Sequence, residues 1–234
     1  MRIAIAGVRG RMGILARAVV EAADDMTFVG GFARVADPGA GIDDDLGRLL
    51  DAVDPHVLLD LTTHPSSVEV ATTAVRRGVH VVIGTSGWLP DEREALGALA
   101  QRNNVGALLV PNFAIGAVLM MRFAEEAARF FPTVEIVETH HEKKLDAPSG
   151  TARITAQRIE AVRGAPVPIH SVRLRGVVAQ QEVLFGGHSE TLTIRHDAIS
   201  RDAFAPGIAL AIRAVTGLVG LTIGLPLPEP DARP

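Results

Sequence analysis

The sequence predicts an α/β protein in which a doubly wound parallel sheet is joined to a second, α+β domain with a mixed open sheet. Two observations support this fold class. Short apolar strands alternate with helical patterns from Arg2 to Val110, and such alternation is typical of parallel sheets covered by helices. From Thr133 onward, strand patterns dominate instead. We therefore expect one domain formed by residues 1–113 and rejoined by residues 206–234, and a second formed by residues 114–205.

The composition excludes several classes of protein. The 234-residue chain is 47% hydrophobic and has a net charge of −4, so it can form sizeable cores but lacks a global basic surface for nucleic acid. It has no cysteine, which excludes disulfides, a thiol nucleophile and cysteine-ligated metal, and fits a reducing cytosol. No apolar run matches a signal-peptide core or a membrane span. We expect a cytoplasmic protein without nucleic-acid or membrane partners.

The first predicted strand, Arg2–Ala6, leads into the glycine-rich turn Gly7-Val8-Arg9-Gly10-Arg11-Met12-Gly13. A helical pattern follows, with apolar residues at Ile14, Leu15, Ala18, Val19 and Ala22. Strand, glycine turn and helix form the context of a dinucleotide fingerprint, because backbone N–H groups at a helix N-terminus can approach a pyrophosphate closely. The alternative is a turn without a ligand, with Arg9 and Arg11 as solvated residues. The position at the start of a Rossmann-like pattern favours nucleotide binding.

The rest of the first domain continues the alternation. We predict strands at residues 27–32, 57–61, 79–83 and 105–110, and helices that end at residue 52, run from 66 or 67 to 77, and start at Pro90. A standard NAD site has an acidic residue at the end of the second strand, but this chain has Arg34 there, which favours the 2′-phosphate of NADPH. Turns that begin at Gly84 and Pro111 follow strands, where ligands bind in open parallel sheets.

The second half has a different pattern. We predict one long helix at 115–131, strands at 133–139, 169–174, 177–185 and 190–196, and a hairpin turn at Gly186-Gly187. A sheet with few covering helices must bury its other face, so we expect self-association through it. A last helix at 208–218 and a strand at 221–223 should rejoin the first domain, and the tail from Pro226 should be irregular.

The segment from Glu138 to Ala152 is the richest in chemical groups. It joins a strand to a helix through His140, His141, Lys143 and Lys144, and these two lysines are the only ones in the chain. An ammonium group can donate a proton where a guanidinium cannot, imidazoles titrate near neutral pH, and a helix N-terminus attracts a carboxylate. Two lysines that fall by accident in a surface loop are the alternative. Their neighbours favour a site for an anionic substrate.

The run from His140 to Thr151, His-His-x-x-Lys-x-Asp-Ala-Pro-Ser-Gly-Thr, resembles the signature of the 4-hydroxy-tetrahydrodipicolinate reductase (dihydrodipicolinate reductase) family at all twelve positions. The resemblance implies hydride transfer to C4 of the dehydrated form of 4-hydroxy-tetrahydrodipicolinate, in the diaminopimelate route to lysine. It implies that His140 acts as acid/base and Lys144 as proton donor, while His141, Gly150 and Thr151 hold a dicarboxylate. Arg173 and Arg175 could also reach a carboxylate.

The resemblance also implies NADPH or NADH as cofactor, a homotetramer, and closure of two domains around the reactants. The cofactor-binding residues would be Gly7, Val8, Arg9, Gly10, Arg11, Met12, Arg34, Gly84, Thr85, Ser86, Val110, Pro111, Asn112 and Phe113. The loop Leu61-Thr62-Thr63-His64-Pro65 departs from the family's Asp-Phe-Thr-x-Pro pattern, with Leu61 for the aromatic residue and one extra residue.

Two other functions remain open from the sequence. The first is that of a different two-domain nicotinamide reductase, such as an amino-acid dehydrogenase, and the Pro-Ser-Gly-Thr loop argues against it. An NADPH-responsive binding protein with a vestigial site would bind cofactor without turnover. We expect no metal site, because adjacent His140 and His141 would point to opposite faces of a continuing strand.

Overall fold

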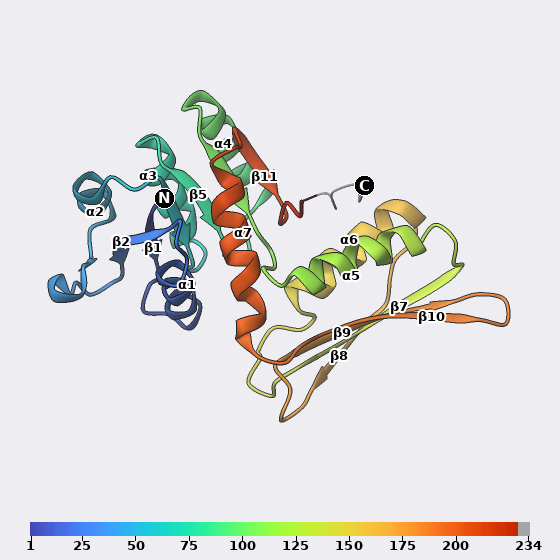
Figure 1. Cartoon of the computed structure of the whole chain (residues 1–234). Coiled ribbons are helices and arrows are strands. Elements are labelled where there is room, and N and C mark those ends of the chain that lie inside the picture. Colours follow the sequence, from blue (N-terminus) through green and yellow to red (C-terminus); the bar gives the residue numbers. More distant parts are fainter. Residues whose placement is uncertain (229–234) are drawn as a thin grey trace, which may run out of the picture. The chain divides into compact units, whose positions relative to one another are not determined.

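A computed structural model describes residues 1–228 and divides the chain into two compact units (Figure 1). Unit 1 comprises Met1–Phe113 and the segment that begins at Ala205, and unit 2 comprises Ala114–Phe204. The roles of unit 1 in dinucleotide binding and of unit 2 in substrate binding and oligomerisation remain predictions. The last six residues of the predicted first domain, and with them most of the tail expected to be irregular, lie outside the described residues.

Unit 1 is built on a seven-stranded parallel sheet with the strand order β11-β6-β5-β4-β1-β2-β3. Helices α2, α3 and α4 contact one face of this sheet, and α1 and α7 contact the other, so the predicted doubly wound fold is confirmed. The strands are β1 Arg2–Ala6, β2 Thr27–Phe32, β3 Ile42–Asp43, β4 Val57–Asp60, β5 His80–Ile83, β6 Gly106–Leu109 and β11 Gly220–Ile223. The helices are α1 Arg11–Glu21, α2 Leu46–Val53, α3 Ser66–Arg76, α4 Pro90–Arg102 and α7 Ala205–Val215, and a 3-10 turn spans Pro38–Ala40.

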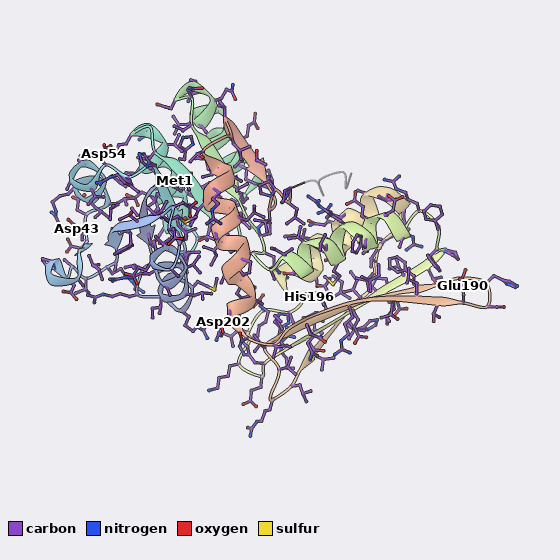
Figure 2. All side chains as sticks on the ribbon, viewed as in Figure 1. Met1, Asp43, Asp54, Glu190, His196 and Asp202 are labelled. Atoms are coloured by element: carbon purple, nitrogen blue, oxygen red, sulfur yellow. The ribbon has the colours of Figure 1, made fainter. Side chains whose placement is uncertain are left out.

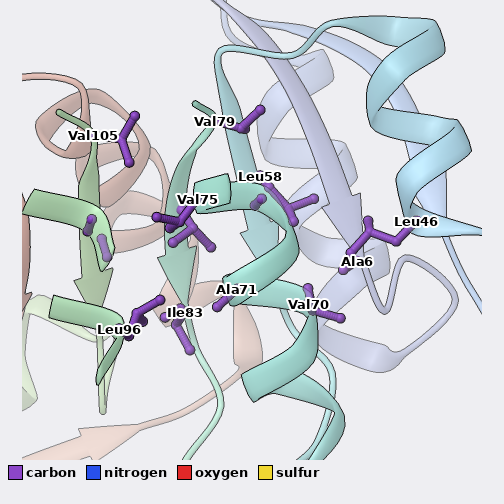
Figure 3. Packing of buried hydrophobic residues seen from close by; sticks show 14 of the residues in the cluster. Ala6, Leu46, Leu58, Val70, Ala71, Val75, Val79, Ile83, Leu96 and Val105 are labelled. Carbon is purple, nitrogen blue, oxygen red and sulfur yellow. The ribbon is translucent and has the colours of Figure 1, made fainter. Parts of the chain in front are cut away.

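The core of unit 1 explains why its strands are almost continuously apolar. All four residues of β4 are buried, because helices cover both faces of the sheet. Side chains that alternate along the strands, such as Leu58 and Ile83, pack against Val70 and Leu96 of the covering helices (Figure 3). The chain returns to this sheet at its far end, where β11 pairs with β6 and Leu221 lies opposite Ala107.

Helix α1 buries a different face from the one that its apolar residues indicated. Its buried residues are Gly13, Ala16 and Val20, whereas Ile14 is 63% exposed. The reason is a close backbone approach, since a Cβ atom on Gly13 would lie 2.2 Å from the carbonyl oxygen of Gly7 and 2.7 Å from Val8. Only small residues allow the helix to approach the turn this closely, so residue size, rather than hydrophobicity, sets the buried face.

Unit 2 contains a four-stranded mixed sheet with the order β10-β9-β7-β8, in which β7 and β8 are parallel and the other neighbours are antiparallel. Helices α5 and α6 pack on each other and on the sheet, and alternate residues of β7 and β9 are buried. The ring of Phe185 meets that of Phe131 at 5.6 Å between centroids. The elements are α5 Ile115–Ala127, β7 Thr133–His140, α6 Gly150–Arg163, β8 Ile169–Arg173, β9 Ala179–Gly186, β10 Thr191–Ala198 and a 3-10 turn at Arg201–Phe204.

Several predicted boundaries need correction. Helix α5 ends at Ala127 rather than Phe131, because residues 128–130 form a turn two residues before Pro132. The predicted hairpin between β9 and β10 is present, but its loop spans residues 187–190. The backbone N–H of Gly187 donates to the carbonyl of Glu190, which lies at the hairpin tip (Figure 2). Ser189, rather than a glycine, adopts a positive φ, of 64°. Helix α7 begins three residues earlier than expected, since Pro206 suits a first helical turn. No helix within residues 1–228 has the length and apolar character that crossing a membrane requires.

The close approach of α1 to the glycine turn gives a stability prediction. Replacing Gly13 with Ala should destabilise unit 1 by about 2–3 kcal/mol, because the added methyl group meets backbone atoms that cannot move aside. Urea unfolding followed by the fluorescence of the single tryptophan, Trp88, reports on this unit. Gly217→Ala is the matched control, since its Cβ meets only a carbonyl oxygen at 3.7 Å. Equal unfolding midpoints for the two variants would contradict the close-approach explanation.

Candidate functional site

The predicted strand–loop–helix arrangement is present in unit 2. Strand β7 ends at His140, a polar loop follows, and helix α6 starts at Gly150. Ser149 is the N-cap: its hydroxyl accepts a hydrogen bond from the backbone N–H of Ala152 at 3.1 Å. The first turn of α6 contains no acidic residue, so the partial positive charge of the helix N-terminus is not neutralised within that turn.

The side chain of Glu138 lies at the centre of this arrangement and is fully buried. Its carboxylate accepts hydrogen bonds from both terminal nitrogens of Arg173, each at 3.0 Å, and from the backbone N–H of Ser149 at 3.2 Å. The Nδ1 atom of His140 lies 2.5 Å from Oε2 of the same carboxylate. Burial by itself would raise the pKa of Glu138, but hydrogen bonds from Arg173, Ser171 and His140 outweigh it and hold that pKa below its ordinary value.

His140 is half-buried, and its environment keeps it neutral. Burial lowers the pKa of its imidazole, and the positive charges of Lys144 and Arg173 lower it further, whereas Glu138 opposes the shift without reversing it. In the unfolded chain, the imidazole of His140 would bind a proton more readily than in the folded protein. The free energy of unfolding therefore receives the full contribution of the neutral imidazole above the unfolded pKa near 6.5, and this contribution decreases as the pH falls below that value. A neutral imidazole can exchange a proton with a ligand at pH 7.

The other predicted substrate residues lie in the loop and at the start of α6. Lys144 is held by Asp146, whose two carboxylate oxygens each lie 2.8 Å from Nζ, and this contact lowers the pKa of Asp146. Lys143 is exposed and His141 is half-buried. Gly150 and Thr151 form the first turn of α6, and a Cβ on Gly150 would meet no atom within 4 Å. The predicted substrate residues thus all lie on the last residue of β7, the loop that follows it or the first turn of α6.

Two arginines that could have reached a substrate carboxylate are instead engaged within unit 2. Arg173 donates hydrogen bonds to the Glu138 carboxylate and to the carbonyl oxygen of Asp146, so it connects the loop to strand β7. Arg175 pairs with Glu142 at 2.7 Å and is largely exposed. Because β7 ends at His140, His141 is not part of a strand, and strand geometry does not require the two histidines to point to opposite faces. Residues 1–228 contain no group of three or more His, Cys, Asp or Glu side chains placed to hold a metal ion.

The glycine turn of unit 1 has the geometry of a phosphate cradle. Gly7 adopts a positive φ of 77°, and a Cβ there would lie 2.6 Å from the carbonyl oxygen of Leu61. Helix α1 begins directly after Gly10, with no side-chain cap and no acidic residue in its first turn. A cavity of about 890 Å³ opens over this turn, lined among others by Gly7, Gly10, Arg9 and Arg34. Its size, glycine wall and cationic side chains fit the phosphate-bearing part of a dinucleotide.

The remaining predicted cofactor residues do not line this cavity. The side chains of Val8, Val110 and Phe113 are buried in the core, so any cofactor contact there would use backbone atoms. Arg11 and Met12 begin α1. The turn after β5, Gly84-Thr85-Ser86, is tied to its neighbour, because the Thr85 hydroxyl donates to the carbonyl of Thr62 at 2.9 Å. Pro111 and Asn112 follow β6.

Sequence reasoning missed two features of unit 1. The cavity is also lined by Thr62 and Thr63 of the loop after β4, and by three acidic residues, Asp44 and Asp45 before α2 and Glu69 in the first turn of α3. The second feature is a fully buried carboxylate, Asp60, at the end of β4. It accepts hydrogen bonds from the backbone and hydroxyl of Thr62 and from the hydroxyl of Ser67, which in turn accepts one from Trp88. Burial raises the pKa of Asp60 despite these donors. An acidic residue that ends an otherwise apolar strand was the available signal.

Comparison with known proteins gives a match for each of the two units. Residues 1–113 match the family model described as dihydrodipicolinate reductase, N-terminus, and residues 116–223 match the model described as dihydrodipicolinate reductase, C-terminus. A 4-hydroxy-tetrahydrodipicolinate reductase of Geobacillus thermodenitrificans is 46% identical over 258 aligned positions, which cover 96% of this chain and 97% of the relative. The chain belongs to the dihydrodipicolinate reductase family. A relative of the same name from Streptomyces griseus is 45% identical over 96% of each chain.

Solved structures support the same family. The dipicolinate-bound dihydrodipicolinate reductase of Paenisporosarcina sp. TG-14 superposes with a TM-score of 0.86 at 38% identity, covering 96% of this chain and 98% of that one. An amine dehydrogenase of Mycobacterium smegmatis has a TM-score of 0.71 at only 14% identity, which shows a shared fold alone. As a dihydrodipicolinate reductase family member, the chain is an oxidoreductase, and the resemblance noted in the His140–Thr151 segment is confirmed.

The buried pair in unit 2 gives a second stability prediction. Arg173→Leu should destabilise the protein by about 3–5 kcal/mol at pH 7, because it leaves the Glu138 carboxylate buried without its cation. The loss should shrink toward pH 4, where the unpaired Glu138 can protonate. Far-ultraviolet circular dichroism during urea unfolding at both pH values measures this.

Arg175→Leu is the matched control, since this exposed arginine lies two residues away and should change stability by less than about 0.5 kcal/mol. A loss for Arg173→Leu that is equally large at both pH values would argue against an unpaired carboxylate as its cause.

Proposed function

We propose that this chain catalyses the NAD(P)H-dependent reduction of the dehydrated form of 4-hydroxy-tetrahydrodipicolinate to tetrahydrodipicolinate, in the diaminopimelate route to lysine. The observation that carries the proposal is the polar loop of unit 2, which holds two imidazoles, the only two lysines and a helix N-terminus within twelve residues. Curated relatives that share 44–46% identity over 96% of the chain carry the corresponding name.

The substrate has two carboxylates, and the loop offers groups for both. We assign them to His141 and to the Gly150-Thr151 start of α6, where the helix dipole favours an anion. Lys143 adds positive charge from its exposed position. The Paenisporosarcina reductase was solved with dipicolinate, a planar ring with two carboxylates, and its similarity to this chain supports the assignment.

The reaction needs a hydride at C4 of the ring and one proton. When bound, the reduced nicotinamide supplies the hydride. The conjugated imine then becomes an enamine, and Lys144 donates its proton to the ring nitrogen. His140 moves a proton from that nitrogen to the ring carbon, so the net uptake is one proton. The low pKa of His140 suits this exchange, because the imidazole is neutral and can both accept and return a proton.

For the cofactor, we propose NADPH or NADH in the cavity of unit 1, with the pyrophosphate at Gly7–Met12 and the nicotinamide end near Gly84–Ser86 and Val110–Phe113. Arg34 lines the cavity and has no ion-pair partner among residues 1–228, so its charge is available for a 2′-phosphate. Asp44 is paired with Arg48, and Asp45 caps α2, which limits their repulsion of that phosphate.

We also propose a cytoplasmic homotetramer that assembles through the sheet of unit 2. Helices α5 and α6 cover only one face of this sheet (Figure 1). The opposite face carries Val137, Val172 and Leu184, and Val172 is 40% exposed. Analytical ultracentrifugation should give four times the 24.7 kDa chain mass, whereas a monomer at micromolar concentration would refute the assembly.

The activity is tested with the product of aspartate semialdehyde and pyruvate, made by the upstream synthase, while NADPH absorbance is followed. Oxidation should exceed the no-enzyme control. His140→Gln and Lys144→Ala should each lower kcat by roughly 10²–10⁴, the usual contribution of a positioned acid or base. Lys143→Ala is the matched control and should change kcat by less than about 10-fold. Full rates in both His140→Gln and Lys144→Ala would show that their roles are misassigned.

Cofactor preference is tested at Arg34. Arg34→Ala should raise the Kd for NADPH by about 10-fold or more, because hydrogen bonds to a charged phosphate contribute about 1.5–3 kcal/mol. The Kd for NADH should change by less than about 3-fold, since that cofactor lacks the 2′-phosphate. Fluorescence titration measures both constants, and equal losses for the two cofactors would remove Arg34 from the 2′-phosphate site.

A further inference from the structure

The hydrogen bonds of Glu138 restrict what its neighbour His140 can do. An ionised carboxylate offers about four lone-pair positions. In unit 2 four nitrogen atoms lie within 3.2 Å of the two oxygens: Nη1 and Nη2 of Arg173, the backbone N of Ser149, and Nδ1 of His140. The first three always carry hydrogen. Of these four nitrogen atoms only the imidazole nitrogen could be either a donor or an acceptor, and the Ser171 hydroxyl is a further donor to the carboxylate.

The charge state of Glu138 decides between these two possibilities. Its carboxylate is ionised at neutral pH, because the guanidinium of Arg173 binds it through both nitrogens inside the core. An unprotonated Nδ1 facing an ionised oxygen at 2.5 Å would place two lone pairs against each other. The contact is therefore a hydrogen bond donated by Nδ1–H.

We propose that Glu138 is a positioning residue which fixes His140 in the Nδ1–H tautomer and so leaves its Nε2 atom unprotonated toward the substrate. This inference rests on the proposed function only for the identity of that substrate. In this tautomer His140 begins the cycle as a proton acceptor at Nε2. The first proton must then come from another group. Lys144 and Arg173 are the cationic side chains whose charges act on this imidazole, and of the two only the ammonium of Lys144 can donate a proton. His140 returns a proton only after it has received one.

The same hydrogen bonds predict what an amide would do at this position. In Glu138→Gln one oxygen becomes an NH₂ group. At the Oε1 position both neighbours, Arg173 Nη2 and Ser149 N, are obligatory donors, so the amide oxygen remains there. At the Oε2 position the NH₂ group loses the single hydrogen bond from Arg173 Nη1 and faces His140, whose imidazole can accept a hydrogen at Nδ1 by carrying its own proton on Nε2 instead. The variant should therefore hold His140 in the opposite, Nε2–H tautomer.

Long-range ¹H–¹⁵N correlation spectra of the ¹⁵N-histidine-labelled protein read the tautomer directly. The His140 signals are assigned by their loss in His140→Gln. At pH 7.5 the wild-type protein should show a protonated Nδ1 and an unprotonated Nε2 at His140, and Glu138→Gln should show the reverse. A wild-type Nε2–H tautomer would overturn the proposal, and this reading needs neither substrate nor turnover, so it is independent of the proposed reaction.

Kinetics test whether the tautomer matters for catalysis. Glu138→Gln should lower kcat by about 10²-fold or more, while KM for the dicarboxylate changes by less than about 3-fold, because the anion-binding loop keeps its Arg173 and Ser149 contacts. Glu138→Asp retains a carboxylate and should recover part of the lost rate. The pH profile of kcat should shift with Glu138→Gln, since Glu138, Lys144 and Arg173 are the charged groups that act on His140.

Glu135→Gln is the matched control. Glu135 lies on the same strand with its side chain on the exposed face, where it pairs with His170. This variant should leave both the His140 tautomer and kcat unchanged. If Glu138→Gln fails to fold, the wild-type spectrum still decides the tautomer. Unchanged kcat in a folded Glu138→Gln protein that has switched tautomer would show that the tautomer has no role in the reaction.

Discussion

The hydrogen-bonded ion pair of the buried Glu138 carboxylate is the interaction on which the candidate site of unit 2 depends. The carboxylate joins three elements that are distant in sequence: strand β7, which carries it, strand β8 through Arg173, and the start of helix α6 through Ser149. A buried carboxylate without a cation would cost several kcal/mol, so these three elements form a stable arrangement only together. The loop between β7 and α6 is thereby fixed at both ends, and His140 and Lys144 lie on it. The same ion pair explains why so polar a segment can be ordered at the edge of a small mixed sheet.

Unit 1 depends on close backbone packing rather than on a buried ion pair. A dinucleotide has to approach the backbone, and the chain allows this by removing side chains rather than by adding charged pairs. Gly7 and Gly13 bring the turn and helix α1 within van der Waals contact, which leaves the N-terminus of the helix open toward the cavity. The buried Asp60 then ties the loop after β4 to α3 through Thr62 and Ser67. Each unit therefore has one buried carboxylate that anchors a loop of its candidate site, although only Glu138 has a cationic partner.

Much of this could be predicted from the sequence, and the failures have physical causes. The alternation of strands and helices was sufficient to predict the doubly wound sheet, and the run from His140 to Thr151 was sufficient to identify the family. The helix α1 was predicted, but its buried face could not be, because Gly13 and Ala16 pack through their small size, which a hydrophobic pattern cannot show. Arg173 was predicted as a possible ligand for substrate because its partner, Glu138, lies 35 residues away and is brought close only by strand pairing. The acidic residues beside the cavity were missed for the same reason, since they come from the segment before α2 and from α3, and not from the end of β2.

Hydrogen exchange of the wild-type protein and of Glu138→Ala, which removes every hydrogen-bond acceptor of this side chain, followed by mass spectrometry, tests most directly whether this carboxylate organises the loop. The account predicts faster exchange in the variant for amides between His140 and Ala152, including the Ser149 N–H that donates to Glu138. Exchange in helix α5 and in the strands of unit 1 should stay the same. Unchanged exchange throughout the loop would contradict the account, because the loop would then hold its conformation without the buried carboxylate.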